Sequence, residues 1–319
     1  MKHKLTLSVV FIAISFCSSC AVGRSCNPGQ LIFPGAKLTE QYVDKAVFFE
    51  GPCWDRTSNK LYFCAWGNPK QVLRLDAKDT VTVWINDPDD QIGVNGIFYS
   101  NTGILLTAQV FAHKLVSYVG GEKPQQKQVL AYNDKWNQPN DVCQSPAGEI
   151  YFSDPQWDDY FSNPPKRDGD HSNSAVYCIK KDGSVCKVID DLPGPNGVIV
   201  SNDGKTLYVA DSIQSKWWSY PIIEEGVLGQ PQVFFELDRT DQYDDFDRPD
   251  GSTIDEYGNV YLTGLGGVRI VSPSGKLLKM IPTTEKASNV TFGGADNKTL
   301  FITCDGKLYS LQMSVRGGG

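Results

Sequence analysis

The sequence predicts an all-β protein, a six-bladed β-propeller with four-stranded antiparallel blades. Three observations lead to this prediction. One unit recurs six times along the chain, short alternating or apolar runs are separated by turn residues, and the sequence offers no amphipathic helix of three turns. A period of about 40 to 55 residues with strand and turn signals is typical of propellers, in which each repeat forms one blade.

The chain begins with the pattern of a secretory signal peptide. A basic stretch, Lys2 to Lys4, precedes an apolar run from Leu5 to Phe16, and small residues follow up to Ala21. This order predicts export with cleavage after Ala21, and the run is too short to form a transmembrane segment. A bacterial lipoprotein signal, with a lipid anchor on Cys20, is the alternative. The expected divisions are a signal peptide over 1–21, an N-terminal extension over 22–44, the propeller over 45–315 and a tail over 316–319.

Each of the six units carries a polar residue at the same place in an apolar run. In the fourth unit, Asn196-Gly-Val-Ile is followed by the turn Asn202-Asp-Gly and a second apolar run. The first strand of every propeller blade lines the central channel, so we expect the six polar side chains to converge there. In chain order they are Glu50, Asn95, Asn140, Asn196, Asp250 and Asn289.

The remaining strands are short runs between turns. Alternating or apolar stretches bounded by Gly, Asn, Asp or Ser predict half-buried or buried strands. The expected strands include Val72–Asp76, Thr80–Trp84, Lys114–Tyr118, Val176–Ile179 and Val268–Val271. We expect Leu308–Leu311 to pair beside the first blade and close the ring, which leaves few open sheet edges.

Two acidic stretches, 157–173 and 241–247, interrupt the strand pattern. We interpret the first as a loop over the face where substrates enter, and a plain surface insertion explains it equally well. The second leads directly into Arg248-Pro-Asp250. No Pro/Ser-rich linker separates two halves of the chain, so a single propeller domain is expected.

Composition excludes several function classes. The formal net charge of −7 argues against nucleic acid and anionic membranes as partners. His113 and His171, the histidines beyond the signal, supply too little imidazole for a usual catalytic zinc site. They also lack the Gly-x-Ser-x-Gly motif that would suggest a Ser–His–Asp triad. No glycine loop opens a helix, so no nucleotide cofactor is expected.

The cysteines leave two interpretations open. Beyond the signal their number is odd, and Cys53 with Cys64, and Cys178 with Cys186, flank turns. Either pair could form a disulfide across its hairpin. Buried free thiols in strands are the favoured interpretation.

The polar residues that recur at one phase predict a metal site. Glu50 and Asp250 are hard anionic oxygen donors, and Asn140 and Asn196 are hard neutral ones. Ca²⁺ binds about six to eight such oxygens, often completed by water. Any one of these residues could have a purely structural role, with an Asn bonded to neighbouring backbone or Asp250 in a turn. Such roles do not explain why all four stand at the same position of the repeat. Zn²⁺, Mn²⁺ and Mg²⁺ remain alternatives. Asn95 and Asn289 are expected to contact these ligands or the substrate.

A set of motifs then reveals a family resemblance. The chain resembles the gluconolactonase / senescence-marker-protein-30 / luciferin-regenerating-enzyme family over about residues 45–315. The motifs are Glu50-Gly-Pro-x-Trp, Pro139-Asn-Asp, Tyr151-Phe-Ser-Asp-Pro, Gly194-Pro-Asn-Gly-Val, Leu207-Tyr-Val-Ala-Asp-Ser, Arg248-Pro-Asp-Gly and Ser288-Asn-Val-Thr-Phe-Gly-Gly.

The resemblance implies a six-bladed propeller with one catalytic divalent cation, usually calcium. It places the metal ligands at Glu50, Asn196 and Asp250, with Asn140 bound to metal or substrate. It also implies that Asp250 is the acid/base residue. Two departures concern the pocket: Gln138 stands where animal members have Arg, and Val110-Phe111 replace a frequent His-Gly.

These observations predict a secreted, calcium-dependent lactonase that hydrolyses a small-molecule sugar-acid lactone. The cation would polarise the ester carbonyl and Asp250 would act on the proton of the attacking water. The expected substrate-binding residues are Asn95, Gln138, Asn140, Trp157 and Asn289. An apolar wall at the mouth is expected from Trp54, Trp66, Trp157 and Phe111, and ordinary blade packing explains Trp54 and Trp66 equally well. The alternatives are an organophosphate (phosphotriester) hydrolase on the same metal site and a non-catalytic propeller that binds a sugar or a protein.

Overall fold

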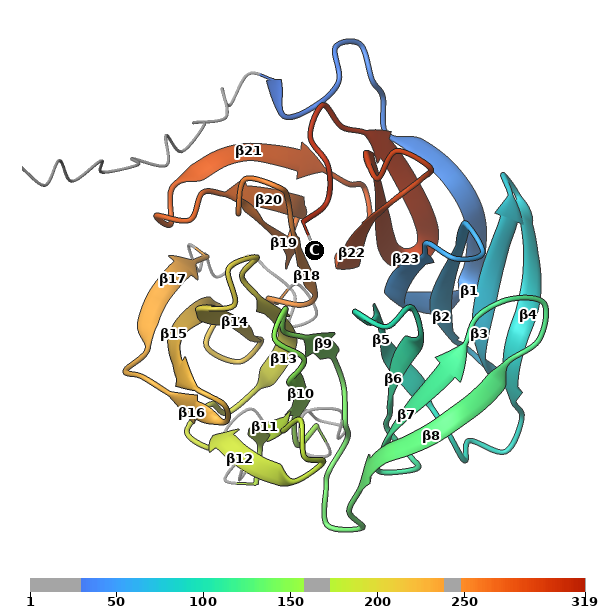
Figure 1. The fold of residues 1–319 in the computed structure, drawn as a ribbon. Coiled ribbons are helices and arrows are strands. Elements are labelled where there is room, and N and C mark those ends of the chain that lie inside the picture. The colour runs from blue at the N-terminus through green and yellow to red at the C-terminus, as the bar shows by residue number, and fades with distance from the viewer. Residues whose placement is uncertain (1–29, 158–172, 238–247, 319) are drawn as a thin grey trace, which may run out of the picture.

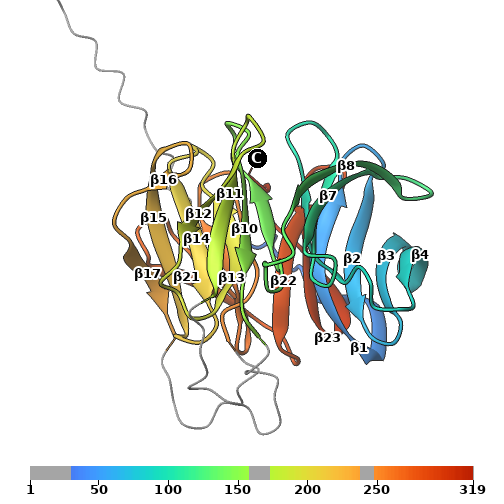
Figure 2. The same ribbon diagram turned by 90° about the horizontal axis from the view of Figure 1, so that it is seen from below.

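A computed structural model describes residues 30–157, 173–237 and 248–318 of the 319-residue chain. Within these ranges the regular structure consists of strands, arranged as antiparallel sheets around a central axis (Figure 1). Seen from the side, neighbouring strands run along one another between the two faces of the ring (Figure 2). Among the described residues, no helix is long and apolar enough to cross a membrane. The signal segment, Cys17, Cys20, Cys26, His171, most of the first acidic stretch and all of the second lie outside the described residues.

The strands form five sheets, so the prediction of six blades is wrong, although a propeller of antiparallel and mostly four-stranded blades is correct. Three sheets have four strands and one has five. The largest sheet has six strands, in the order β22-β23-β1-β2-β3-β4. Its strands are β1 (Thr39–Asp55), β2 (Lys60–Trp66), β3 (Lys70–Ala77), β4 (Thr80–Asp87), β22 (Ala287–Gly293) and β23 (Thr299–Gln312).

Continuous pairing through two long strands explains the six-stranded sheet. The first part of β1 pairs with β23, as in Thr39 opposite Ser310, and its last part pairs with β2, as in Asp55 opposite Lys60. The repeats that contain Glu50 and Asn289 therefore share one sheet, because β1 carries hydrogen bonds from one repeat into the next. The pairing of β1 with β23 also places residues 308–311 beside the start of the ring, where Tyr42 lies opposite Leu308.

The other four sheets follow one another in sequence around the ring (Figure 1). One contains β5 (Val94–Tyr99), β6 (Leu105–Gln109), β7 (Lys114–Val119) and β8 (Gln125–Tyr132). The next contains β9 (Val142–Gln144), β10 (Ile150–Asp154), β11 (Ala175–Ile179) and β12 (Val185–Ile189). The third contains β13 (Pro195–Val200), β14 (Thr206–Asp211), β15 (Lys216–Glu224), β16 (Val227–Leu228) and β17 (Gln232–Glu236). The last contains β18 (Ser252–Ile254), β19 (Val260–Gly264), β20 (Gly267–Val271) and β21 (Leu277–Pro282).

Burial follows the position of a strand within its sheet. Inner strands such as β13 and second strands such as β6 and β19 are buried along their whole length. Outer strands such as β12 and β21 alternate between exposed and partly buried residues. This gradient is expected where inner strands pack between neighbouring sheets and outer strands have one face in water.

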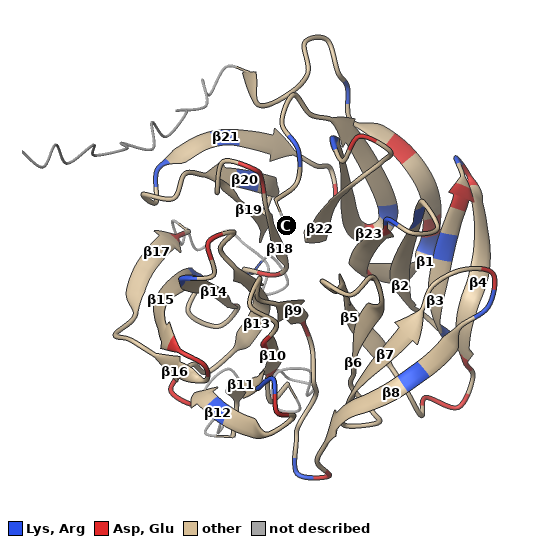
Figure 3. Ribbon diagram, in the orientation of Figure 1, with Lys and Arg blue, Asp and Glu red and all other residues tan. Residues whose placement is uncertain are grey.

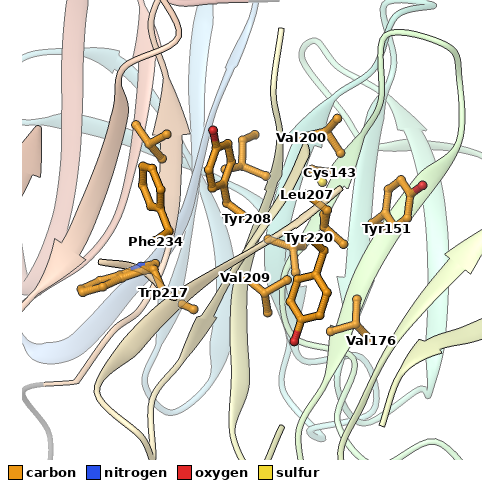
Figure 4. Close-up of a cluster of buried hydrophobic side chains, with 14 of the residues drawn as sticks. Cys143, Tyr151, Val176, Val200, Leu207, Tyr208, Val209, Trp217, Tyr220 and Phe234 are labelled. Carbon is orange, nitrogen blue, oxygen red and sulfur yellow. The ribbon is translucent and has the colours of Figure 1, made fainter. Parts of the chain in front are cut away.

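The hydrophobic core lies between neighbouring sheets. Its largest cluster joins the sheets of β9, β13 and β18, and Figure 4 shows part of it around Tyr208, Trp217 and Phe234. The rings of Tyr208 and Phe234 are 4.6 Å apart between centroids. Burying aromatic rings of this size supplies a large share of the apolar area that stabilises such a ring of sheets. The cysteines at 53, 64, 143, 178, 186 and 304 are free thiols, as favoured from the sequence.

Candidate functional site

The six repeated polar residues lie on the innermost segments, around the central channel. Glu50, Asn95, Asn196 and Asn289 belong to β1, β5, β13 and β22. Asn140 and Asp250 each stand two residues before an innermost strand, β9 and β18. Figure 1 shows β5, β9, β13, β18 and β22 around the centre of the ring. All but Asn140, which is half-buried, are buried, with exposed fractions of 4% for Glu50 and 6% for Asp250.

A shared irregularity of the backbone lies at four of these residues. The strand pairing shifts register between Glu50 and Cys53, between Val94 and Ile97, and between Pro195 and Val198. A similar shift lies between Ala287 and Asn289. Register shifts of this kind bend a strand and change the direction of its side chains, and they are common beside active sites. The repeated polar residue therefore leaves the regular alternation of its strand.

Two glycines show why a residue without a side chain often follows the polar one. A Cβ on Gly51 would lie 2.0 Å from the carbonyl oxygen of Asn95, and a Cβ on Gly197 would lie 2.3 Å from that of Asp250. Each glycine therefore lets the backbone of another polar position pack against it. The Glu-Gly, Asn-Gly and Asp-Gly pairs of the sequence are a packing requirement of the ring as well as a chemical signature.

Hydrogen bonds orient the asparagine amides. The Nδ2 atom of Asn95 donates to the carbonyl oxygen of Asn140 at 3.4 Å, and that of Asn196 donates to Ser212 Oγ at 3.1 Å. Asn289 donates to Glu50 Oε2 at 3.4 Å and accepts from the N–H of Val290 through its own Oδ1. With its oxygen in use, Asn289 is better placed to orient Glu50 than to bind a cation.

Asn140 carries the most informative oxygen of the site. Its Oδ1 atom is buried and has no hydrogen-bond partner among the described residues. Buried polar atoms almost always have a partner, and an orphan in a native site calls for a ligand, an ion or water. The backbone of Asn140 is fixed, since its N–H donates to the carbonyl of Ser153 at 2.9 Å. The Oδ1 atom of Asn140 therefore indicates that an ion, a water molecule or a ligand binds beside it.

The two carboxylates are electrostatically coupled. Burial raises the pKa of Glu50 well above its usual value, and the nearby charge of Asp250 raises it further. Burial also raises the pKa of Asp250, while Lys286 and a hydrogen bond from Asn196 oppose that shift. Two buried groups of like charge are costly to ionise together, and a bound cation removes that cost.

Lys286 is a site residue that the sequence did not reveal. It directly precedes β22, and its Nζ lies 3.1 Å from Asp250 Oδ2. The same Nζ atom of Lys286 also lies over the ring of Phe48, 5.5 Å from the ring centroid. Lys286 is outside the repeated polar phase, and the packing of β22 against β18 brings it beside Asp250.

Asp141 is a second residue that the phase argument missed. Its Oδ1 accepts from the N–H of Val142 and its Oδ2 from the N–H of Val198 in the next sheet, each at 3.0 Å. Burial raises its pKa to about 7. Where four of the other units have glycine after the polar residue, this unit has an aspartate that ties β9 to β13. The sequence signal that could have identified Asp141 is the Asn-Asp pair, which stands here in place of Asn-Gly.

The predicted substrate residues Gln138 and Trp157 lie together ahead of Asn140. The N–H of Trp157 donates to Gln138 Oε1 at 3.2 Å, and the N–H of Gln138 donates to Asp154 Oδ1 at 2.7 Å. Trp157 is buried, with 8% of its surface exposed. Gln138 thus has a fixed position two residues before Asn140.

The aromatic residues separate into two groups. Trp66 and Phe111 pack together with ring centroids 5.8 Å apart, and Trp66 lies opposite Phe48, two residues before Glu50. Trp54 instead stacks on Phe301 with an interplanar angle of 8°. It lines a cavity of about 460 Å³ that extends from Asp141 and Asn289 toward the turns at Asn101 and Asn202. Trp54 therefore does not belong to the same wall as Trp66 and Phe111.

The donor set fits a hard divalent cation. Within the described residues no group of three His, Cys, Asp or Glu side chains could hold a metal, so a soft or zinc-type cluster is absent there. Two carboxylates, Glu50 and Asp250, together with the amide oxygens of Asn140 and Asn196, are instead the hard oxygen type that calcium prefers. The orphan Oδ1 of Asn140 and the coupled buried carboxylates are the two features that such an ion would satisfy.

Comparison with known proteins places this geometry in a family. Residues 48–305 match the model of the SMP-30/gluconolactonase/LRE-like region. The gluconolactonase of Zymomonas mobilis is 28% identical over 273 residues, which cover 80% of this chain and 75% of that protein.

Solved structures give the same picture of the fold. A gluconolactonase from Xanthomonas campestris superposes with a TM-score of 0.74 and 26% identity, covering 89% of this chain and 91% of that one. Regucalcin from Agrobacterium tumefaciens, a calcium-binding protein, has a TM-score of 0.69 with 88% and 95% covered. At 18% identity, this second likeness concerns the fold alone.

Proposed function

The chain belongs to the SMP-30/gluconolactonase/LRE-like family, and we propose that it is a calcium-dependent lactonase that opens the ester ring of a sugar-acid lactone. The observation that carries the proposal is the set of four oxygen donors on the innermost segments, in which Asn140 Oδ1 is buried and has no partner in the part of the chain that the structure describes. The gluconolactonase of Zymomonas mobilis supports the class of reaction, since it matches four fifths of the chain.

Calcium is the cation that the four side chains would hold. Glu50 and Asp250 supply charge, and Asn140 and Asn196 supply neutral oxygens, which leaves positions for water and substrate. When bound, the ion would polarise the lactone carbonyl and stabilise negative charge on its oxygen. The amide nitrogens of Asn196 and Asn289 are held by Ser212 and Glu50, and these contacts fix the donors around the channel.

Asp250 acts as the acid/base residue. Its carboxylate accepts a proton from the water that attacks the carbonyl carbon, and it returns that proton to the ring oxygen as the carbon–oxygen bond breaks. The product is a hydroxy acid, so atoms and protons balance without another reactant. Lys286 and Asn196 hold the carboxylate in place. Pro249 restricts the backbone directly before it.

The residues next to the four oxygen donors would hold the sugar part of the substrate. Asn95, Asn140 and Asn289 carry amide groups suited to hydroxyl groups, and Gln138 stands next to Trp157 at the edge of the channel. Trp66 and Phe111 offer an apolar surface on the side of Glu50. This mixture of amides and aromatic rings suits a polar ring compound with one apolar face.

The experiment that tests the function is a substrate panel run with and without chelator. Purified protein is given δ-lactones and γ-lactones of sugar acids, a simple aryl ester and a phosphotriester, and acid release is followed in a pH-stat. We expect lactone turnover that EDTA abolishes and calcium restores. Turnover that ignores EDTA, or no lactone turnover with calcium present, would contradict the proposal. Preference for the phosphotriester would identify an organophosphate hydrolase instead.

A further inference from the structure

Lys286 places a fixed positive charge against the carboxylates that the proposed function assigns to the cation. We propose that Lys286 is the counter-ion of these carboxylates in the metal-free protein and that, by competing for Asp250, it limits the affinity of the site for divalent cations. The inference rests on the proposed metal site, and it adds a residue that controls how tightly that site is filled.

The carboxylates need a positive partner when no metal is bound. Glu50 and Asp250 are 4% and 6% exposed, and each disfavours ionisation of the other. Among the ion pairs of the described residues, Lys286 is the partner of Asp250, with Nζ 3.1 Å from Oδ2. The Lys286 side chain is itself only 18% exposed, so water screens this pair weakly.

The position of Lys286 is fixed by the sheet that closes the ring. Its carbonyl oxygen accepts the N–H of Asp305, which follows the first part of β23, at 3.2 Å. Two residues later, Ser288 Oγ donates to the carbonyl of Phe49 at 2.6 Å and ties β22 to β1. The ammonium group lies over the ring of Phe48, in the same strand as Glu50. Lys286 therefore reaches the carboxylates from a rigid backbone.

A cation that enters this site meets Lys286 at the same carboxylate. The ammonium group already contacts Asp250 Oδ2, and a divalent ion bound to Asp250 would repel it over a short distance in a poorly hydrated place. Metal binding must then displace or outweigh this ion pair. Removing the positive charge of Lys286 should therefore tighten metal binding, whereas ordinary structural damage to a site weakens it.

The test measures calcium affinity by calorimetry for chelator-stripped protein and four variants. Lys286→Met removes the charge, and we expect it to bind calcium roughly 5- to 100-fold more tightly, the usual range for coupled sites. Lys286→Gln keeps a hydrogen-bond donor for Asp250 and should shift affinity in the same direction. Lys286→Arg keeps the charge and should stay within about threefold of the unaltered protein, well below the coupling range.

Lys307→Met is the matched control. Lys307 is also 18% exposed, but it pairs with Glu40 and Glu285, at 3.1 and 2.9 Å. Its loss removes the same charge from the same sheet without touching Asp250, so calcium affinity should remain near that of the unaltered protein. Equal tightening in Lys307→Met and Lys286→Met would reduce the effect to net charge and overturn the role of Lys286.

Thermal unfolding gives the second measurement. We expect Lys286→Met to melt at a lower temperature than the unaltered protein in EDTA, and to lose most of that difference in calcium. A variant that folds only in calcium would support the counter-ion role, and Lys286→Gln would then supply the affinity. Calcium affinity that is unchanged or weaker in both variants overturns the inference and leaves the lactonase proposal standing. Failure of the unaltered protein and all variants to bind calcium overturns both.

Discussion

At the scale of single residues, Asp250 combines the properties that a general base beside a cation requires. It is 6% exposed, it contacts a positive side chain, and its main-chain N–H donates to the carbonyl of Thr263 in β19. The carboxylate is therefore held in place before any ligand arrives. Glu50 has the same burial but hydrogen bonds to Gly51 and Asn289, and it is better suited to bind a cation than to move a proton.

Substituting Asp250→Asn should separate chemistry from folding. The amide keeps the size of the side chain and one oxygen but cannot accept the proton, so kcat for lactone hydrolysis should fall about 10²- to 10⁴-fold. The melting temperature should change little by comparison. The control is Asp296→Asn, an exposed turn residue, which should leave kcat unchanged. A lactone rate near the original in Asp250→Asn would remove Asp250 from the mechanism.

Asp154 gives a prediction about pH and stability. Burial raises the pKa of Asp154 to about 7. The N–H groups of Asn137 and Gln138 donate to its carboxylate and favour the charged form, but they only partly offset the effect of burial. Because the folded pKa lies above the unfolded one, the folded state binds more protons between roughly pH 4 and pH 7. The contribution of this group to stability is therefore present at low pH and is lost as pH rises through about 7.

Denaturant unfolding of Asp154→Asn at several pH values checks this sign. The original protein should lose stability between roughly pH 4 and pH 7 relative to the variant, because only the original must ionise a buried acid over that interval. Asp203→Asn is a suitable control, since Asp203 is exposed and the pKa of this turn aspartate is lowered. Parallel stability curves for the original and Asp154→Asn would contradict the shift.

At the scale of strands, the close packing between neighbouring innermost segments decides where the polar side chains can stand. The glycine after Asn196 leaves room for the carbonyl of Asp250, and a Cβ there would approach it to 2.3 Å. Backbone atoms cannot yield as a flexible side chain can. The position of Asp250 thus depends on a residue in a different sheet.

Gly197→Ala should therefore damage both stability and activity. Relieving the contact moves the Asp250 backbone, and overpacking of this kind costs about 1 to 3 kcal/mol of unfolding free energy. We expect a lower melting temperature and a lower kcat for lactones. Gly183→Ala is the comparison, because Gly183 lies in an exposed turn with no atom within 4 Å of a new Cβ, and only its positive φ of 85° is strained. Lactone activity in that variant should persist, and an equal loss in both would contradict the packing argument.

The sequence predicted the strands and the polar phase because both are local patterns. Alternation and turn residues located segments such as Val176–Ile179, and the repeat placed Glu50 and Asn289 on innermost strands. The number of sheets is not a local property. The pairing of residues 308–311 beside the first blade was predicted, but the sequence did not show that β1 runs unbroken from its pairing with β23 into its pairing with β2, which joins two repeats in one sheet. Lys286 was not predicted as a site residue for the same reason, since its partner Asp250 lies 36 residues earlier in the chain, next to another sheet.

At the scale of the whole molecule, the ring gathers charge at its centre while the outside is mixed. Figure 3 shows Lys and Arg interspersed with Asp and Glu over the outer strands and loops. The formal net charge is −7. With both signs mixed on the surface, the potential at the channel is governed by the nearby buried groups, above all Glu50, Asp250 and Lys286.

Export is a prediction about the whole chain, drawn from its first 21 residues. The basic start, the apolar run and the small residues should direct the protein out of the cytosol of a bacterial host. Mass spectrometry of protein from the periplasm or envelope should find a chain that starts at Val22, or a lipid-modified Cys20 if the signal is of the lipoprotein type. Intact chain found in the cytosol alone would contradict export.

The central claim is that Glu50, Asn140, Asn196 and Asp250 together bind one catalytic cation. Calorimetric titration of chelator-stripped protein with calcium tests it most directly, with Glu50→Gln as the paired variant. Glu50→Gln keeps the shape of the side chain but removes a charge, so it should weaken binding sharply. The prediction is one calcium ion per chain in the original protein and greatly reduced affinity in the variant. No binding by the original, or equal binding by the two, would contradict the site.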